Sequence, residues 1–317
     1  MPRYPFPINS QYTSVAIAYK NKDLIADLVL PPVPVATREF LYIKHTRENA
    51  FTIPQTLVGR RGTPRQISFT ASEETASTED YGLDDPIPYD DVEAAKASGI
   101  PGLTDPVGMS VEYLTNLLLL DKEVRVAATV FNSTSYAAGN SVVLSGTSQF
   151  SDYANSNPLT ALLGYLDIPL MRPNIMTIGQ DAWRVLRQHP RIVESVSKSG
   201  AGLGAQGTVM REALAELLEI DEVLVGQGWI NASKRGLTPT YSRVWGKHIS
   251  FQYRDKMATP MRGTTFGFNA TWGTRISGQI PDPDIGLRGG LKNRVGWSCK
   301  EVICASDLGY FVQNAVA

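Results

Sequence analysis

Residues 38–92 read REFLYIKHTRENAFTIPQTLVGRRGTPRQISFTASEETASTEDYGLDDPIPYDDV, and no other stretch says as much about the architecture. Two strand-like segments, Phe40–Ile43 and Gln66–Thr70, flank the turn signal Gly59–Pro64. The sequence therefore predicts a long two-stranded ribbon. The ribbon has no core of its own, and an isolated ribbon is only marginally stable in water. We expect a partner outside the ribbon to hold it.

The ribbon carries two blocks of opposite charge. Its first half is basic, and its second half, from Glu73 to Asp91, has only acidic charged residues. A basic arm followed by an acidic one suggests that the partner is another copy of the same chain. A carboxylate cluster can also hold a hard cation, but the ligand order of an EF-hand is absent, so a solvated or arginine-paired face is favoured and no metal is expected. The candidate contact residues between subunits are Arg60, Arg61, Arg65, Glu73, Glu74, Glu79 and Asp80.

Composition restricts the class of protein. The 317 residues are 43% hydrophobic and 19% charged, which allows one large or two modest cores. The formal net charge of −1 disfavours tight, direct binding to nucleic acid, which needs a basic surplus. The N-terminus lacks the pattern of a signal peptide, and no run reaches the roughly 20 apolar residues of a membrane span. We expect a protein made in the cytoplasm, without a membrane partner.

A long helix follows the ribbon. Asp105 and Pro106 form a good N-cap and first-turn pair, and from Val107 to about Phe131 there is no Pro and only one Gly, Gly108. At ~1.5 Å per residue this helix would run roughly 40 Å, as a spine for other elements. Its apolar residues form two rows, Val107, Val111, Leu114 and Leu118 in one and Leu117, Leu120, Val124, Ala127 and Phe131 in the other.

The rest of the chain alternates strand-like and helix-like segments. Residues 1–37 are Pro-rich and predict an extended arm, and a short helical or irregular segment begins near Ile87. The expected strands are Asn174–Ile178, Glu222–Gly226, Ser242–Tyr253, Thr265–Trp272, Arg294–Ala305 and Gly309–Val316, and the expected shorter helices are Gln180–Gln188 and Thr208–Leu218.

Several phrases, in a fixed order, carry a family resemblance. They are IADLVLPPVPV at 25–35, LAELLEIDEVLVG at 214–226, VWGK at 244–247, FGFNATW at 266–272 and DLGYFVQNAV at 307–316. With the ribbon and the long helix between them, the chain resembles a tailed-bacteriophage major capsid protein of the Hong Kong 97 type over nearly its whole length.

The resemblance implies an α+β fold with an N-terminal arm, an extended loop over a neighbouring subunit, a peripheral domain built on the long spine helix, and an axial domain. It implies a non-enzymatic protein that self-assembles into pentamers and hexamers of an icosahedral head around double-stranded DNA. The location would be the virion capsid after assembly in the host cytoplasm, and scaffold, portal and decoration proteins are candidate partners. The implied ranges are 1–37 for the arm, 38–82 for the extended loop, 83–150 and 262–306 for the peripheral domain, and 151–261 and 307–317 for the axial domain.

Some relatives of this fold join subunits by a Lys to Asn isopeptide bond, with the Lys on the extended loop. Here the turn offers Arg60 and Arg61, and the only Lys between residues 23 and 93 is Lys44. A guanidinium stays protonated and is a poor nucleophile. Cys299 and Cys304 are separated by an odd number of positions, which puts them on opposite faces of a strand, and we expect both to be reduced. A noncovalent shell is therefore expected.

Two alternatives remain open. An encapsulin-like compartment would use the same fold around cargo enzymes. A nucleotide-using soluble enzyme could use the glycine-rich loop 200–207, GAGLGAQG, but the glycine spacing is wrong and no Gly-Lys-Ser/Thr follows, so a mobile surface loop is favoured. His45, His189 and His248 match no metal-binding or triad pattern, so we expect no catalytic residues and no cofactor.

Overall fold

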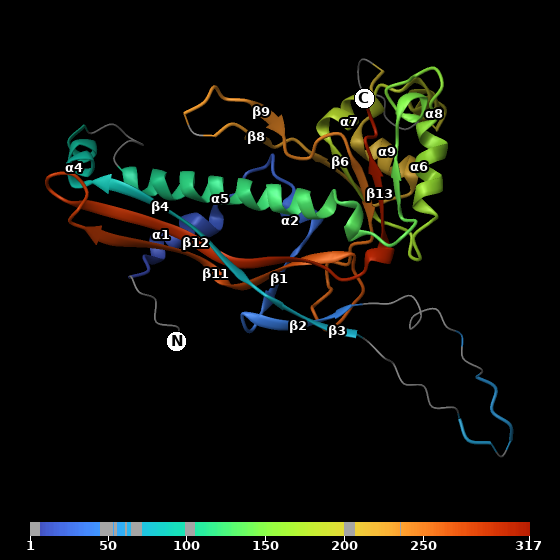
Figure 1. Cartoon of the computed structure of the whole chain (residues 1–317), viewed down its shortest axis with the longest axis horizontal. Helices are drawn as coiled ribbons and strands as arrows, with labels where there is room; N and C mark the ends of the chain where they lie inside the picture. The colour runs from blue at the N-terminus through green and yellow to red at the C-terminus, as the bar shows by residue number, and fades with distance from the viewer. Residues whose placement is uncertain are drawn as a thin grey trace.

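The computed structural model describes residues 7–44, 53, 56–60, 62–64, 72–98, 105–199, 207–234 and 236–317. Two sheets organise this part of the chain, a long one beside a single long helix and a compact one surrounded by short helices (Figure 1). The predicted α+β class agrees with this mixture of elements.

The long helix α5 runs over Pro106–Val130. Its start is fixed as predicted, because the Asp105 side chain accepts a hydrogen bond from the Gly108 amide at 3.0 Å. The four residues of the first apolar row are buried. In the second row only Ala127 is buried, since Leu117 is exposed and Leu120, Val124 and Phe131 are half-buried. The sheet-facing side instead continues through Lys122, Glu123, Val126 and Val130.

The long sheet has the order β1-β11-β12-β4. The antiparallel hairpin of β11 and β12 forms its centre, and both strands extend further toward their shared turn than the sequence predicts. They do so because β4 pairs with the far half of β12, so that the acidic segment after residue 79 becomes an edge strand. The strands are β1 Pro32–Val35, β4 Glu79–Pro88, β11 Gly267–Asp282 and β12 Gly290–Ile303.

The compact sheet has the order β5-β13-β10-β6-β7 and mixes parallel and antiparallel pairs. The prediction of one continuous strand over Ser242–Tyr253 is wrong, because the chain turns at Gly246 with a φ of 54°. The strands are β5 Ser141–Val143, β6 Ile175–Gly179, β7 Glu222–Gly226, β10 Ile249–Gln252 and β13 Gly309–Gln313. Separate from both sheets, β8 Trp229–Asn231 and β9 Tyr241–Arg243 form a small hairpin.

Short helices cover the compact sheet (Figure 1). The helix predicted at 180–188 ends at Leu186, the one predicted from Thr208 begins at Arg211, and the helix over residues 190–199 was not predicted. The helices are α6 Pro158–Leu166, α7 Gln180–Leu186, α8 Pro190–Ser199 and α9 Arg211–Leu218, and single 3-10 turns occur at Ser133–Ser135, Gly146–Ser148 and Ser306–Leu308.

The N-terminal arm is not extended throughout, which corrects the prediction for its described part. It contains helices α1 Ser10–Ala18 and α2 Ala26–Val29 before β1. Prolines do keep residues 32–35 extended, and β1 adds to the long sheet as a parallel edge strand. Because Ala16 packs with Leu114, Leu118 and Val295, α1 joins the core between α5 and the long sheet.

The base of the predicted ribbon is a two-stranded sheet of β2 Glu39–Lys44 and β3 Ser72–Ser77. The predicted first strand lies within β2, whereas the predicted second strand, Gln66–Thr70, falls outside the described residues. The turn signal is confirmed at its start, where the Gly62 amide donates to the Gly59 carbonyl at 2.8 Å. Between β4 and α5, helix α4 Tyr89–Ser98 buries no residue.

Candidate assembly surfaces and the anchored arm

Of the seven predicted contact residues, three have partners in the same chain, two are described as exposed and two lie outside the described residues. Arg61 and Arg65 lie outside the described residues, and Arg60 is exposed in the turn that begins at Gly59. Glu73 is an exposed residue of β3, opposite Ile43. Among the described members of the set, Arg60 and Glu73 form no cluster with Glu74, Glu79 and Asp80.

Glu74, Glu79 and Asp80 have partners within the chain. Glu74 accepts from Lys44 Nζ at 2.8 Å and from the Tyr42 hydroxyl at 2.7 Å, and these bonds lower the pKa of Glu74. The opposite charges of the two halves thus meet across the ribbon's own base. Contacts of these residues with another subunit remain predictions.

The carboxylates of Glu79 and Asp80 join β4 to β12 and to Arg38. Hydrogen bonds from Lys300 and then Tyr81 lower the pKa of Glu79, with Lys300 Nζ at 2.5 Å from the carboxylate. A hydrogen bond from Ser298 is the main cause that lowers the pKa of Asp80, and Arg38 adds an ion pair. These pairs explain why an acidic strand can lie at the edge of the long sheet.

A buried carboxylate anchors the N-terminal arm. Glu123, on the inner face of α5, is fully buried and accepts the Ile25 amide at 3.0 Å and the Ala26 amide at 2.7 Å. It also accepts from the indole Nε1 of Trp245. Burial raises the pKa of Glu123, and the three N–H donors oppose that rise. One side chain thereby joins the arm, the spine helix and the turn before β10.

Trp245 can reach Glu123 because the residue of β7 beneath its ring, Gly226, has no side chain. Trp245 is fully buried, and a Cβ built on Gly226 would lie 2.0 Å from its ring. Any larger residue at position 226 would push the indole off the end of β7. The sequence requirement for Gly226 is therefore steric and serves the same anchor.

The neighbouring residue on α5 makes a second anchor. Lys122, which is 4% exposed, forms an ion pair with Asp27 of the arm. Asn269 of β11 is fully buried. In the orientation that gives both its amide nitrogen and its amide oxygen a partner, the oxygen accepts from Lys122 Nζ at 2.8 Å. A buried ammonium that lacked these partners would be costly.

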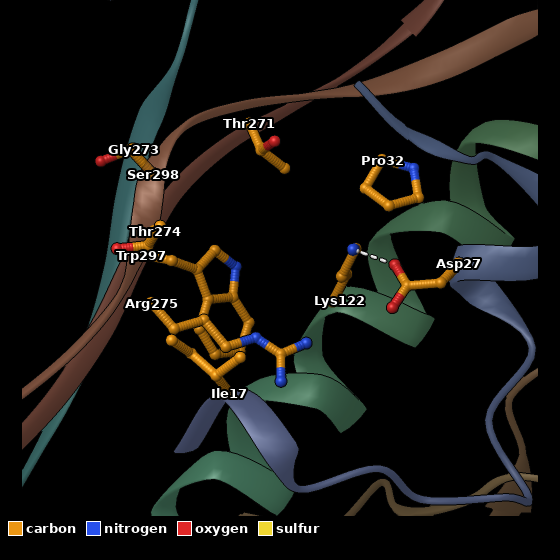
Figure 2. Close-up of a pocket in the computed structure, with 10 residues that line it drawn as sticks. All are labelled: Ile17, Asp27, Pro32, Lys122, Thr271, Gly273, Thr274, Arg275, Trp297 and Ser298. Atoms are coloured by element: carbon orange, nitrogen blue, oxygen red, sulfur yellow. Dashed lines mark hydrogen bonds and ion pairs between the residues drawn. The ribbon is translucent and has the colours of Figure 1, made fainter. Parts of the chain in front are cut away.

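Arg275 of β11 makes the third anchor. Its guanidinium donates to the Ala16 carbonyl at 3.1 Å, at the end of α1, and lies 5.0 Å from the Trp297 ring centre. Figure 2 shows Arg275 and Lys122 facing one open space between the arm, α5 and the central hairpin. This pocket of about 300 Å³ also has Ile17 and Pro32 in its wall. Its charged groups are used to hold the arm, so we interpret it as a structural joint.

Sequence reasoning did not find these anchors. Lys122 and Glu123 are adjacent charged residues on a helix, a pattern that ordinarily indicates solvent. The only available signal was their position, because the sheet-facing side that passes through Leu118 and Leu119 continues to Lys122 and Glu123 at three-and-four spacing.

The two described histidines, His189 and His248, form hydrogen bonds within the fold, and His248 Nδ1 accepts the Asn314 amide at 3.0 Å. His189 is fully buried, and its Nδ1 accepts the Arg191 amide at 3.3 Å, so the proton sits on Nε2, which faces the Ser156 hydroxyl at 3.1 Å. Ser156 itself donates to the Asp152 carbonyl. A ring nitrogen that already carries a proton cannot accept one from Ser156, so this pair has no activated nucleophile. His45 lies outside the described residues.

The described ranges contain no group of three or more His, Cys, Asp or Glu side chains arranged to hold a metal ion. None of the helices described is both long and apolar enough to span a bilayer.

The two cysteines are free, and both are buried. Cys299 lies in β12 with the guanidinium of Arg125 at 3.6 Å, whereas Cys304 follows the end of that strand and packs in the cluster with Val33 and Tyr42. Burial raises the pKa of both thiols, that of Cys304 to about 12.

These features define a class of protein: a subunit with a long and a compact sheet, an arm clamped by buried charges, and a small separate hairpin of β8 and β9. No family model matches the chain. The chain is 48% identical, over all 317 residues and the full length of both proteins, to the major capsid protein of Pseudomonas phage JBD67.

Solved structures agree in fold. A phage-related protein from Bordetella bronchiseptica RB50 is similar with a TM-score of 0.75 and 19% identity, and the match covers 98% of each chain. The putative capsid protein of an Escherichia coli CFT073 prophage is similar with a TM-score of 0.60 and 11% identity, and covers 98% of this chain and 99% of that one. The chain belongs to the family of phage major capsid proteins, which confirms the resemblance found in its sequence.

Proposed function

We propose that this major capsid protein assembles into the pentamers and hexamers of an icosahedral head that encloses double-stranded DNA. The observation that carries the proposal is the full-length match to a phage major capsid protein at 48% identity. The near-neutral charge of −1 supports a container without tight DNA binding. The compartment alternative, a shell around cargo enzymes, has less support because the curated relative is a phage protein.

The second part of the proposal assigns a structural role to each segment of the chain. Residues 1–37 would act as the arm, 38–82 as the extended loop, 83–150 with 262–306 as the peripheral domain, and 151–261 with 307–317 as the axial domain. Support for the loop comes from its base, because β2 and β3 pack on the long sheet through Phe40 and Tyr42 and so hold both ends of the segment on one subunit. Scaffold, portal and decoration proteins are candidate partners, and assembly in the host cytoplasm is part of the same proposal.

The third part is that the shell is noncovalent. Lys44 is engaged with Glu74, and both cysteines are buried thiols whose pKa is raised. None of these groups is a good nucleophile in its observed state. Stability must then come from many weak contacts spread over neighbours.

Two measurements on one preparation test the proposal. The protein is expressed in bacteria with its phage's other head proteins, and light scattering should show megadalton particles rather than 34.6 kDa monomers. The particles are then boiled in detergent with reductant and run on a gel. A single band near 34.6 kDa is expected. A ladder of dimers and larger species would overturn the noncovalent part, and a failure to form particles would overturn the assembly itself.

A further inference from the structure

The hairpin of β8 and β9 is a second ribbon that the sequence did not predict. It pairs with no other strand in the described part of the chain, and Figure 1 shows it beside α5, apart from both sheets. The Asn231 side chain joins the two ends of its loop, because it accepts from the Ser233 amide at 3.1 Å and from the Thr240 amide at 3.1 Å. The hairpin is therefore a preformed projection.

One face of this hairpin has the composition of a protein interface. Trp229 pairs with Arg243 and Asn231 with Tyr241, so these residues lie on the same side of the ribbon. Arg243 stacks on Trp229 with 3.9 Å from its guanidinium carbon to the ring centre. Trp229 is 52% exposed and Tyr241 is 67% exposed. Trp, Tyr and Arg are the residue types that dominate binding energy at interfaces.

A complementary groove lies elsewhere in the molecule. This groove has a volume of about 530 Å³ and lies between α4, the first turns of α5 and the end of β4. Met109 and Tyr113 form its apolar wall on α5, where they are 51% and 65% exposed. Asp85 and Asp91 supply negative charge at the same groove.

We propose that the β8–β9 hairpin of one copy docks into the α4–α5–β4 groove of the next copy. Aromatic side chains on the hairpin meet Met109 and Tyr113, and the basic residues Arg243 and Lys234 meet the acidic ones. Because two different surfaces meet, the contact is head-to-tail and can close a ring. This inference rests on the proposed function, since rings of one chain are the units of such a shell.

Crosslinking tests the contact directly. Tyr241→Cys and Tyr113→Cys are introduced into one chain, and assembled particles are oxidised and run on a non-reducing gel. A ladder that stops at five or six chains is expected, and each single variant should stay monomeric. The matched control pairs Tyr113→Cys with Leu287→Cys, because Leu287 is a fully exposed residue of the β11–β12 turn.

Each outcome decides the proposal. Wild-type particles together with a monomeric double variant would overturn it, and so would a disulfide formed within one chain. Dimers from Tyr241→Cys alone would indicate hairpin-to-hairpin contact and would also overturn it. If the double variant is folded but does not assemble, Trp229→Ala decides: a fall in assembled fraction of about tenfold, with Leu287→Ala unchanged, supports the contact. Absence of wild-type particles would instead count against the proposed function.

Discussion

Glu123 shows how much of this fold depends on single buried charges. The carboxylate receives three N–H donors from the arm and from Trp245, so it is a fixed acceptor at the meeting point of three segments. Lys122 and Arg275 also bind the arm through charged side chains, Lys122 at Asp27 and Arg275 at Ala16. Removal of one partner from such a buried set leaves the others unsatisfied, which costs more than the bond itself contributes.

Glu123→Gln is therefore expected to destabilise the unassembled subunit by roughly 1–3 kcal/mol. The amide keeps the volume but turns an NH₂ group toward an N–H donor that needs an acceptor. Chemical denaturation measures the change, and Glu216→Gln on the exposed side of α9 serves as the control. Equal stability of Glu123→Gln and wild type would show that the arm is held by other contacts.

Leu118 tests the apolar side of the same helix. It is 4% exposed and packs with Ala16 of α1 and Val295 of β12. Leu118→Asp places an unpaired charge there, at a cost of several kcal/mol, and should give insoluble protein. Leu117→Asp is the matched control, because Leu117 is exposed one position earlier. Soluble, folded Leu118→Asp would contradict the packing described.

At the scale of elements, the tip of the ribbon is expected to control assembly. Arg60 is exposed, and an arginine pair on a thin ribbon suits the carboxylates of a neighbour. Arg60→Glu with Arg61→Glu should leave a folded monomer that forms no shells in electron micrographs. Lys247→Glu with Lys256→Glu, a reversal of equal size at exposed sites, is the control. Normal shells from the Arg60 and Arg61 variant would refute this role.

The base of the ribbon should respond to acid. The pKa of Glu74 is lowered in the fold, so its bonds stabilise above the ordinary glutamate value of 4.5 and are lost as the pH falls below it. We expect hydrogen exchange in β3, normalised to β6, to be unchanged from pH 7 to 5 and faster below pH 4. Glu74→Gln should remove this dependence, and Glu73→Gln should not. Acid-independent protection of β3 in wild type would contradict the pairing.

Elements also show where sequence reasoning succeeds and fails. Helix α5 could be predicted because Asp105, Pro106 and the absence of later breakers are local signals. The full length of β11 and β12 could not, since residues such as Arg294 are kept in the strand by a distant partner, Asp84, which its guanidinium contacts at 2.5 Å. Helix α1 was missed although Asn9 caps it locally, accepting from the Gln11 amide at 3.0 Å, because most of its packing comes from the distant α5 and the long sheet.

At the scale of the whole molecule, one core joins the two sheets. It contains Ile25 and Val29 from the arm, Val126 and Val130 from α5, and residues of both sheets around Trp245 and Phe311. The arm is thus part of the junction between the long and the compact sheet. The family could be recognised from the order of short phrases, whereas the anchors and the hairpin surface depend on contacts between segments far apart in the sequence.

Cryo-electron microscopy of purified particles tests the central claim, that this subunit builds an icosahedral head, most directly. The account predicts closed shells with pentamers and hexamers, in which each subunit places its ribbon over an adjacent subunit and no covalent density joins the two chains. Protein that remains monomeric when the other head proteins are present, or particles in which the ribbon folds back on its own subunit, would contradict it.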